Sequence, residues 1–282
     1  SMLADMHLLM VFPMMLAVAV TALDAADLKQ DLTFRAPFDG SMDAATGAGD
    51  KRLYSAPNYK EQAAAQPGLG AAAADIELAR GAGRKGDALR FKKKNTRAIF
   101  FKADRNVAFD PKNWTGTISF WLNLDPDADL EPGFCDPIQV TDKAYNDSAI
   151  WVDFTKDDKP RHFRLGVFGA LSAWNPKNLP ADKDPTFNNR LVVRKKPAFA
   201  RGKWTHVAIA FQGLGSGNGK ATLYLDARPV GTTPAIPEVF SWDLEKGAIR
   251  LGVNYTGLLD DVAVFKRALT EEEIRQIRSG KF

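Results

Sequence analysis

The chain has 282 residues, 45% of them hydrophobic, so it can bury a full core as one large all-β domain or as two smaller domains. Its net charge of +4 at pH 7 is too modest for the dense basic surface of a nucleic-acid-binding protein, and we expect no nucleic-acid partner. The single cysteine, Cys135, excludes a disulfide within the chain and a cysteine-based metal site.

An apolar N-terminal segment bears on where the protein resides. Residues 8–23 are almost uninterrupted apolar sequence, and residues 20–22 (Val-Thr-Ala) place small side chains at the −3 and −1 positions of a cleavage site. The pattern predicts an apolar helix within residues 1–26 that acts as an export signal, with the mature protein periplasmic, at the cell surface or extracellular. Residues 1–7 contain no Lys or Arg, which leaves a retained membrane anchor or a buried helix as alternatives.

Short strands dominate the rest of the chain. Residues 28–38 are predicted to form the first strand, and residues 40–86, poor in large apolar side chains, to form a long excursion with one short helical turn. Residues 117–124 show the clearest alternation, with Ile, Phe, Leu and Leu on one face. Further strands are predicted at residues 88–91, 98–101, 149–154, 162–168, 191–193, 203–211, 221–226, 248–253 and 260–265. Strands without intervening helices predict an all-β fold, a two-sheet antiparallel sandwich or jelly roll.

Two predicted loops and a terminal helix complete the pattern. Residues 125–147 and 171–190 are rich in Pro, Asp and Asn and exceed hairpin length, so we expect specificity to lie there. Residues 270–273 (Thr-Glu-Glu-Glu) fit a capping box and predict a short C-terminal helix, which Ile274 and Ile277 would dock on the sandwich.

Several blocks, taken in order, resemble laminin-G-like jelly-roll domains of the concanavalin A-like lectin/glucanase superfamily. They are residues 37–40 (PFDG), 86–91 (GDALRF), 117–122 (TISFWL), 202–208 (GKWTHVA), 221–226 (ATLYLD) and 257–274. The resemblance implies a concanavalin A-like jelly roll over residues 27–282. One departure is Ala227, where the family usually has the glycine of an Asp-Gly turn. Alanine is less favourable than glycine at positive φ, so we expect a different turn type there.

The carboxylate pattern of glycosidases on this fold is missing. Those enzymes carry Glu-x-Asp-x-x-Glu on one strand, and a retaining mechanism needs two carboxyls about 5 Å apart. The nearest strand here, residues 151–155 (Trp-Val-Asp-Phe-Thr), supplies only Asp153. His206 lies in the Trp-x-His block of the family and is interpreted as structural. We therefore expect no enzymatic activity, with a polysaccharide-active hydrolase or lyase as an alternative.

The resemblance also implies a structural Ca²⁺ site. Asp39 and Asp260 match positions that can converge on the ion, with Asp43 and Asp261 as further candidate ligands. The alternative is that these aspartates cap turns by accepting backbone N–H groups.

Aromatic side chains in the loops are candidate sugar contacts, because pyranose rings stack on Trp and Tyr. Trp174, in the second long loop, is the first candidate for a solvent-facing contact, followed by Trp242 and Tyr255. Packing within the loops is the alternative for each of them.

A basic run is the second candidate contact. Arg90, Lys92, Lys93 and Lys94 would meet an anionic glycan or lipid headgroup, or would simply form a solvated strand end.

Three functions follow from these patterns. The first is an exported, non-catalytic recognition domain that binds a glycan or a protein. The second is an accessory structural subunit of a membrane complex, anchored by the N-terminal helix. The third is a polysaccharide-active enzyme.

Overall fold

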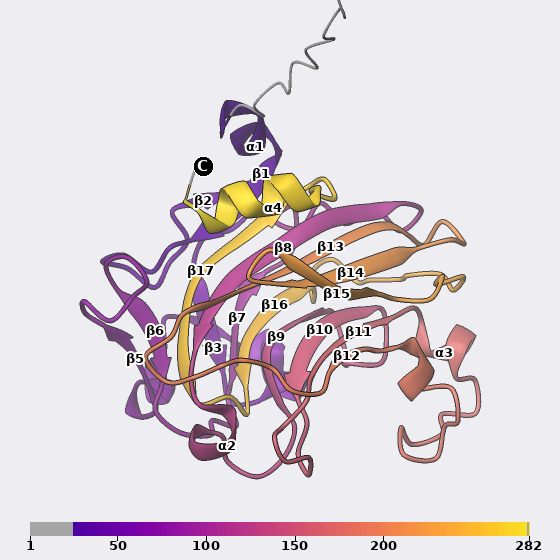
Figure 1. The fold of residues 1–282 in the computed structure, drawn as a ribbon, viewed down its shortest axis with the longest axis horizontal. Helices are drawn as coiled ribbons and strands as arrows, with labels where there is room; N and C mark the ends of the chain where they lie inside the picture. Colours follow the sequence, from indigo (N-terminus) through magenta and orange to yellow (C-terminus); the bar gives the residue numbers. More distant parts are fainter. Residues whose placement is uncertain (1–24, 281) are drawn as a thin grey trace, which may run out of the picture.

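Two antiparallel β-sheets pack face to face in the computed structural model, which describes residues 25–280 and 282 (Figure 1). Sheet A contains β1 (Leu32–Ala36), β2 (Thr46–Gly47), β5 (Ile76–Ala79), β6 (Ala88–Phe91), β8 (Trp114–Asn123), β13 (Thr205–Leu214), β14 (Lys220–Leu225), β15 (Arg228–Thr232) and β17 (Gly257–Phe265). Sheet B contains β3 (Leu53–Ala56), β4 (Gln66–Pro67), β7 (Ala98–Lys102), β9 (Cys135–Thr141), β10 (Ala149–Phe154), β11 (Phe163–Phe168), β12 (Val192–Arg194) and β16 (Ala248–Val253). The predicted all-β sandwich is confirmed.

The helical elements are short. They are α1 (Ala25–Asp31), η1 (Tyr59–Ala64), η2 (Gly70–Ala74), α2 (Pro126–Asp129), α3 (Leu171–Trp174), η3 (Asn188–Arg190) and α4 (Glu271–Arg278). Within residues 25–280 and 282, no helix has the length and apolar character needed to cross a bilayer. The predicted apolar helix at residues 8–23 lies outside the described residues.

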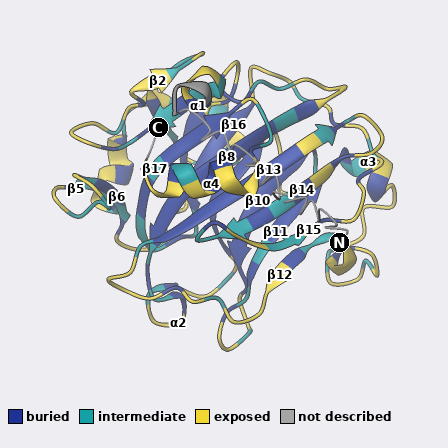
Figure 2. Ribbon diagram, turned by 45° about the horizontal axis from the view of Figure 1, so that its top comes forward, coloured by how far each residue is buried: buried dark blue, intermediate teal, exposed yellow. Residues whose placement is uncertain are grey.

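Strand order follows the connectivity of a jelly roll. Sheet A runs β15-β14-β13-β8-β17-β1-β2, with β6 also paired to β17 and β5 to β6. Sheet B runs β12-β11-β10-β9-β16-β7-β3-β4. Alternate residues point inward and form one core between the sheets, with Ile118, Phe120 and Leu122 from β8 packed in the same cluster as Ile150 and Val152 from β10. Figure 2 shows these strands as mostly buried and the connecting loops as exposed.

Three sequence-based predictions of local structure were wrong. Residues 28–31 belong to helix α1, and only residues 32–36 form the first strand. The excursion over residues 40–86 holds β2 to β5 and two 3-10 helices in place of one helical turn. Residues 125–147, predicted as loop, contain α2 and the seven-residue strand β9, which carries Pro137 beside a register shift in its pairing with β10. A proline within a sheet is tolerated at such a bulge, which explains why the strand was missed.

The turn after β14 keeps the geometry that its sequence argued against. Asp226 and Ala227 both have positive φ, +48° and +61°, as expected for a tight hairpin turn that ordinarily takes Asn-Gly or Asp-Gly. The expected change of turn type was therefore wrong. The Ala227 side chain is buried in the small cluster beneath α4, so the methyl group that strains the turn is also packed.

The capping box of the terminal helix is confirmed. Thr270 Oγ1 accepts the backbone N–H of Glu273, and the Glu273 carboxylate accepts the backbone N–H of Thr270. Ile274 and Ile277 dock on alanines of β13 and β17 on the outer face of sheet A, where α4 crosses the strands (Figure 2).

Removing the cap tests its contribution to stability. We predict that Thr270→Ala lowers the free energy of unfolding by about 1 kcal/mol, because one backbone N–H of the first turn loses its acceptor. The measurement is urea unfolding, with Glu272→Gln as control. That control removes only an exposed Glu272–Arg275 pair and should cost less than about 0.5 kcal/mol. Equal losses in the two variants would contradict the assignment.

Candidate functional site

A cavity of about 680 Å³ lies against the outer face of sheet B. Its floor consists of outward-pointing residues of three neighbouring strands, since the residues that alternate with them lie in the core. Asp136 and Gln139 come from β9, Trp151 and Asp153 from β10, and Arg164 from β11. The remaining lining residues are Phe134, Tyr145, Lys156, Ala181, Asp182, Phe187, Asn188, Val253 and Asn254.

The register between β10 and β11 shapes the floor. Trp151 lies directly opposite Gly166, and a Cβ atom at Gly166 would stand 2.2 Å from the Trp151 ring. Glycine is therefore required there for the indole to lie over the neighbouring strand. The Trp151 Nε1–H donates to the backbone oxygen of Tyr145 at 2.7 Å, which ties the floor to the rim.

Two carboxyls lie side by side on this floor. Asp153 lies opposite Arg164 in the register and accepts two hydrogen bonds from its guanidinium, at 2.8 and 2.6 Å. Asp136 accepts from Gln139 Nε2 at 2.9 Å, and Gln139 Oε1 accepts in turn from Arg250 Nη1 at 2.7 Å. Each carboxyl is thus held in a fixed orientation by a neighbouring side chain.

Burial dominates the titration of this pair. It raises the pKa of Asp136 well above its ordinary value, and the neighbouring Asp153 carboxylate raises it further. Burial also raises the pKa of Asp153, against the opposing effect of its hydrogen bonds from Arg164. Sequence reasoning found Asp153 alone. It missed Asp136 because the pairing of β9 with β10, which brings the two together, is not visible in a segment that reads as a loop.

Exposed aromatic side chains form the rim of the cavity. Phe134 and Tyr145 retain 41% and 38% of their accessible surface although both line the cavity. Tyr145 belongs to the first long segment expected to carry specificity, and Phe187 and Asn188 belong to the second. Both segments therefore meet at this cavity.

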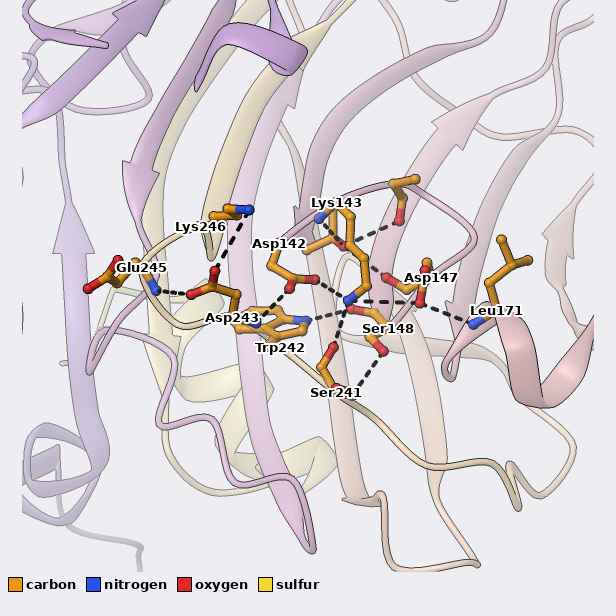
Figure 3. Close-up of polar contacts among 12 residues, drawn as sticks. Asp142, Lys143, Asp147, Ser148, Leu171, Ser241, Trp242, Asp243, Glu245 and Lys246 are labelled. Atoms are coloured by element: carbon orange, nitrogen blue, oxygen red, sulfur yellow. Dashed lines mark hydrogen bonds and ion pairs between the residues drawn. The ribbon is translucent and has the colours of Figure 1, made fainter. Parts of the chain in front are cut away.

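A polar cluster holds the hairpin that carries Tyr145 (Figure 3). The ammonium of Lys143 contacts Asp142 Oδ1 at 2.6 Å and donates to the Ser241 carbonyl at 2.7 Å. Asp142 Oδ2 accepts the backbone N–H of Asp243 at 2.7 Å. These contacts fasten residues 142–148 to residues 241–243 and fix one wall of the cavity.

The aromatic residues proposed from the sequence lie elsewhere. Trp174 is buried against Phe168, and its indole N–H donates to Asn146 O, so it packs the loop and is not the solvent-facing contact expected. Tyr255 is fully buried, and its hydroxyl donates to Leu258 O. Trp242 is partly buried, stacks on Phe109, and donates to Ser148 O.

Packing explains each of these positions. Every one of the three rings has an apolar face to cover and a polar atom satisfied by a backbone carbonyl, which is the usual arrangement of a buried Trp or Tyr. None of the three lines the cavity on sheet B.

The basic run is largely paired within the protein. Arg90 and Lys92 face Glu77, at 3.1 and 4.0 Å, and Lys93 lies 3.3 Å from Asp75. Lys94 Nζ donates to Pro132 O. The run begins on β6 of sheet A, away from the cavity floor, and two carboxylates offset part of its charge.

The aspartates proposed to bind calcium do not form a coordination shell. Asp43 accepts the backbone N–H of Leu53, apart from the other three. Asp39, Asp260 and Asp261 line a small cavity together with Arg35, Arg84 and Lys85.

Most carboxylate oxygens of this small cavity already accept hydrogen bonds, including Asp39 Oδ1 from the backbone N–H of Asp87. Both oxygens of Asp261 accept from Arg35, and the two oxygens of Asp260 accept backbone N–H groups of Arg84 and Asp261. Within the described residues no group of three acidic, His or Cys side chains is arranged to hold a metal. These residues therefore do not fit Ca²⁺. Asp39, Asp43 and Asp260 accept backbone N–H groups, as the turn-capping interpretation expects, whereas Asp261 pairs with the Arg35 side chain.

His206 lies in a closed environment on the opposite sheet. Its Nε2 lies 2.7 Å from Ser119 Oγ, and its ring packs beside Trp121, with no exposed surface. Burial lowers the pKa of His206 to about 3, so the imidazole is neutral at physiological pH. The position fits the packing role expected from the sequence.

The Lys143 cluster is tested by removing its ammonium. We predict that Lys143→Met lowers the free energy of unfolding by about 1–3 kcal/mol, because the Asp142 carboxylate loses its cation while its side chain stays 5% exposed. Faster hydrogen exchange in residues 142–148 should accompany the loss. The matched control, Lys246→Met, removes an exposed pair with Asp243 and should change stability little. Unchanged exchange in the hairpin would contradict its assigned role.

Asp260 gives a prediction on pH. Burial raises its pKa to about 7, with the Asp261 and Asp39 charges adding to the shift. The folded state therefore binds a proton that the unfolded state releases near pH 4, so this group's stabilisation is full below pH 4 and is lost as pH rises to 7.

The amplitude is bounded by about 1.4 kcal/mol for each unit of pKa shift. We predict that Asp260→Asn loses less stability than the parent between pH 4.5 and 7.5, measured by urea unfolding. Asp157→Asn, at an exposed position, should follow the parent. If the stability of Asp260→Asn falls with rising pH as steeply as that of the parent, Asp260 is not the group responsible for the pH dependence.

Comparisons with known proteins identify the family to which this fold belongs. Residues 101–275, more than half of the chain, match the laminin-G family model described as the concanavalin A-like lectin/glucanases superfamily. Comparison with curated proteins gave no significant match.

Solved structures show the same fold at low sequence identity. Domain 4 of AbnA, a GH43 extracellular arabinanase from Geobacillus stearothermophilus, in complex with arabinotriose, is 18% identical with a TM-score of 0.53, over 88% of this chain and 98% of that one. The binding domain of botulinum neurotoxin DC matches over 90% of this chain at 9% identity, with TM-scores of 0.57 in complex with SialylT and 0.53 in complex with rat synaptotagmin II. This chain covers 52% of those two neurotoxin chains, about half of their length. The sequence match and the fold together show that the chain belongs to the concanavalin A-like lectin/glucanases superfamily.

Proposed function

We propose that the protein is an exported, non-catalytic recognition domain that binds a glycan in the cavity on sheet B. The observation that carries the proposal is the combination of an exposed aromatic rim, Phe134 and Tyr145, with a floor of fixed polar side chains. A sugar ring offers C–H faces to aromatic rings and hydroxyls to carboxyls, amides and guanidinium groups. The cavity volume is in the range of small-ligand sites and suits one to a few sugar residues.

Structures of the same fold in complex with glycans support this proposal. The arabinanase domain is described with arabinotriose and the neurotoxin domain with SialylT, so the fold hosts glycan binding in other proteins. The neurotoxin domain is also described with a protein partner, synaptotagmin II. The glycan is favoured here because a cavity with polar side chains on its floor and exposed aromatic rings at its rim suits hydroxyl-rich ligands better than a flat protein surface. Export rests on the apolar pattern of residues 8–23.

Hydrolysis is a second candidate, favoured by the two adjacent carboxyls of Asp136 and Asp153. Both oxygens of Asp153 are occupied by the Arg164 guanidinium, which suits a fixed recognition group better than a nucleophile. Release of reducing ends from polysaccharides by the parent protein, lost in Asp136→Asn, would establish the enzyme and overturn the non-catalytic proposal.

Binding is tested by screening the mature protein on a glycan array and measuring the best oligosaccharide by calorimetry. We predict that Phe134→Ala and Tyr145→Ala each weaken that interaction about tenfold, because each removes an exposed ring from the rim. Leu244→Ala is the matched control, since Leu244 is similarly exposed but does not line the cavity.

Two results would count against the site. No binding to any glycan would reject glycan recognition. Glycan binding that is unchanged in Phe134→Ala and Tyr145→Ala would place the ligand elsewhere on the protein.

A further inference from the structure

The charged groups of the cavity are arranged unevenly between its floor and its rim. Five ionisable side chains other than tyrosine line it: the acidic Asp136, Asp153 and Asp182, and the basic Lys156 and Arg164. The two floor carboxyls are 8% and 3% exposed, so they interact with a ligand in a weakly screened environment. Lys156 is about half exposed, so solvent screens its charge far more.

The cations that face the floor are already committed to its carboxyls. Arg164 uses Nε and Nη2 on Asp153, and Arg250 reaches Asp136 only through Gln139. Among the described residues, the Asp136 carboxyl accepts a single hydrogen bond, from Gln139 Nε2. A carboxyl has about four lone-pair sites, so accepting capacity remains at the cavity floor.

We infer that the cavity selects uncharged sugars and rejects acidic glycans. This inference rests on the proposed glycan-binding function and adds the chemical class of its ligand. A neutral sugar hydroxyl can donate to either floor carboxyl and accept from the Arg164 guanidinium or the Asn254 amide. The hydroxyls of one sugar therefore find both acceptors and donors among the side chains that line the cavity.

A sugar carboxylate lacks this match. It brings acceptors only, and at the floor it meets the Asp136 and Asp153 carboxyls. The charge of Asp153 already disfavours ionisation of Asp136, and a further negative charge would add to this repulsion. Arg164 can offer a ligand carboxylate only the N–H groups that Asp153 leaves free, so the neighbouring Asp153 carboxylate opposes any ion pair formed there. Rejection of the wrong ligand thus comes from groups built into the floor.

The overall positive charge does not reverse this selectivity. The formal charge of +4 belongs to the whole chain, whereas the cavity lining has three acidic and two basic side chains. The basic run near β6 is partly offset by Glu77 and Asp75 and does not line the cavity. Any electrostatic attraction of an acidic glycan to the protein therefore arises outside the cavity and not at its floor.

The test compares matched probes that differ by one oxidation at C6. Gluco-oligosaccharides and galacto-oligosaccharides are measured against glucurono- and galacturono-oligosaccharides of the same length, on an array and then by calorimetry with the best pair. We expect the acidic probe to bind at least tenfold more weakly than its neutral counterpart. Asp136→Asn should narrow that difference at a pH above the raised pKa of Asp136, where it removes one floor charge and hydrogen bonding to Gln139 remains possible.

The controls separate the inference from the function on which it rests. Asp104→Asn, an exposed charge change outside the cavity, should leave the neutral-to-acidic ratio unchanged. Equal or tighter binding of acidic probes, lost in Phe134→Ala, would overturn the selectivity while retaining the glycan site. Binding of neither probe class nor any other glycan on the array would overturn both.

Discussion

The pairing of β10 with β11 is the constraint on which the cavity depends. In one register it sets Trp151 against Gly166 and Asp153 against Arg164, while Ile150, Val152 and Phe154 enter the core. Because strand side chains alternate with a period of two, a slip by one residue would turn the floor into the core. The core between the sheets thus secures the register, and the register secures the polar floor.

This dependence explains how a stable sandwich supports charged groups on its outer face. The Asp153–Arg164 pair is shielded from water but forms two hydrogen bonds across two neighbouring strands, and Gln139 links Asp136 to Arg250 on the other side. Buried polar groups are tolerated when their partners are fixed in this way. The Lys143 cluster extends the same principle to the wall that carries Tyr145.

The sequence predicted architecture far better than it predicted the site. Alternation in β8 and β13 and the Thr270–Glu273 capping box are local patterns, and the structure confirms them. Asp136 was missed because its importance arises from a neighbour seventeen positions away on a paired strand, in a segment whose proline and aspartates read as loop.

The prediction that Trp174 faces solvent was wrong for a related reason. Position in a long loop says little about exposure when that loop packs its own aromatic cluster, here with Phe168 and Phe187. Membership of the superfamily likewise identifies the scaffold, whereas ligand choice depends on side chains of the cavity. The calcium ligands implied by the resemblance show this difference between scaffold and site. Asp261 accepts hydrogen bonds from the Arg35 guanidinium, and Asp260 accepts them from backbone N–H groups.

The most direct measurement of the central claim is an NMR titration of the indole N–H signals with the tightest neutral oligosaccharide. The Trp151 indole lies at the cavity floor and donates to Tyr145 O, whereas Trp121 lies on sheet A beside His206. Glycan binding in the cavity predicts that the Trp151 signal shifts in a saturable manner while the Trp121 signal stays fixed. A saturable shift of Trp121 with Trp151 unchanged would contradict the account.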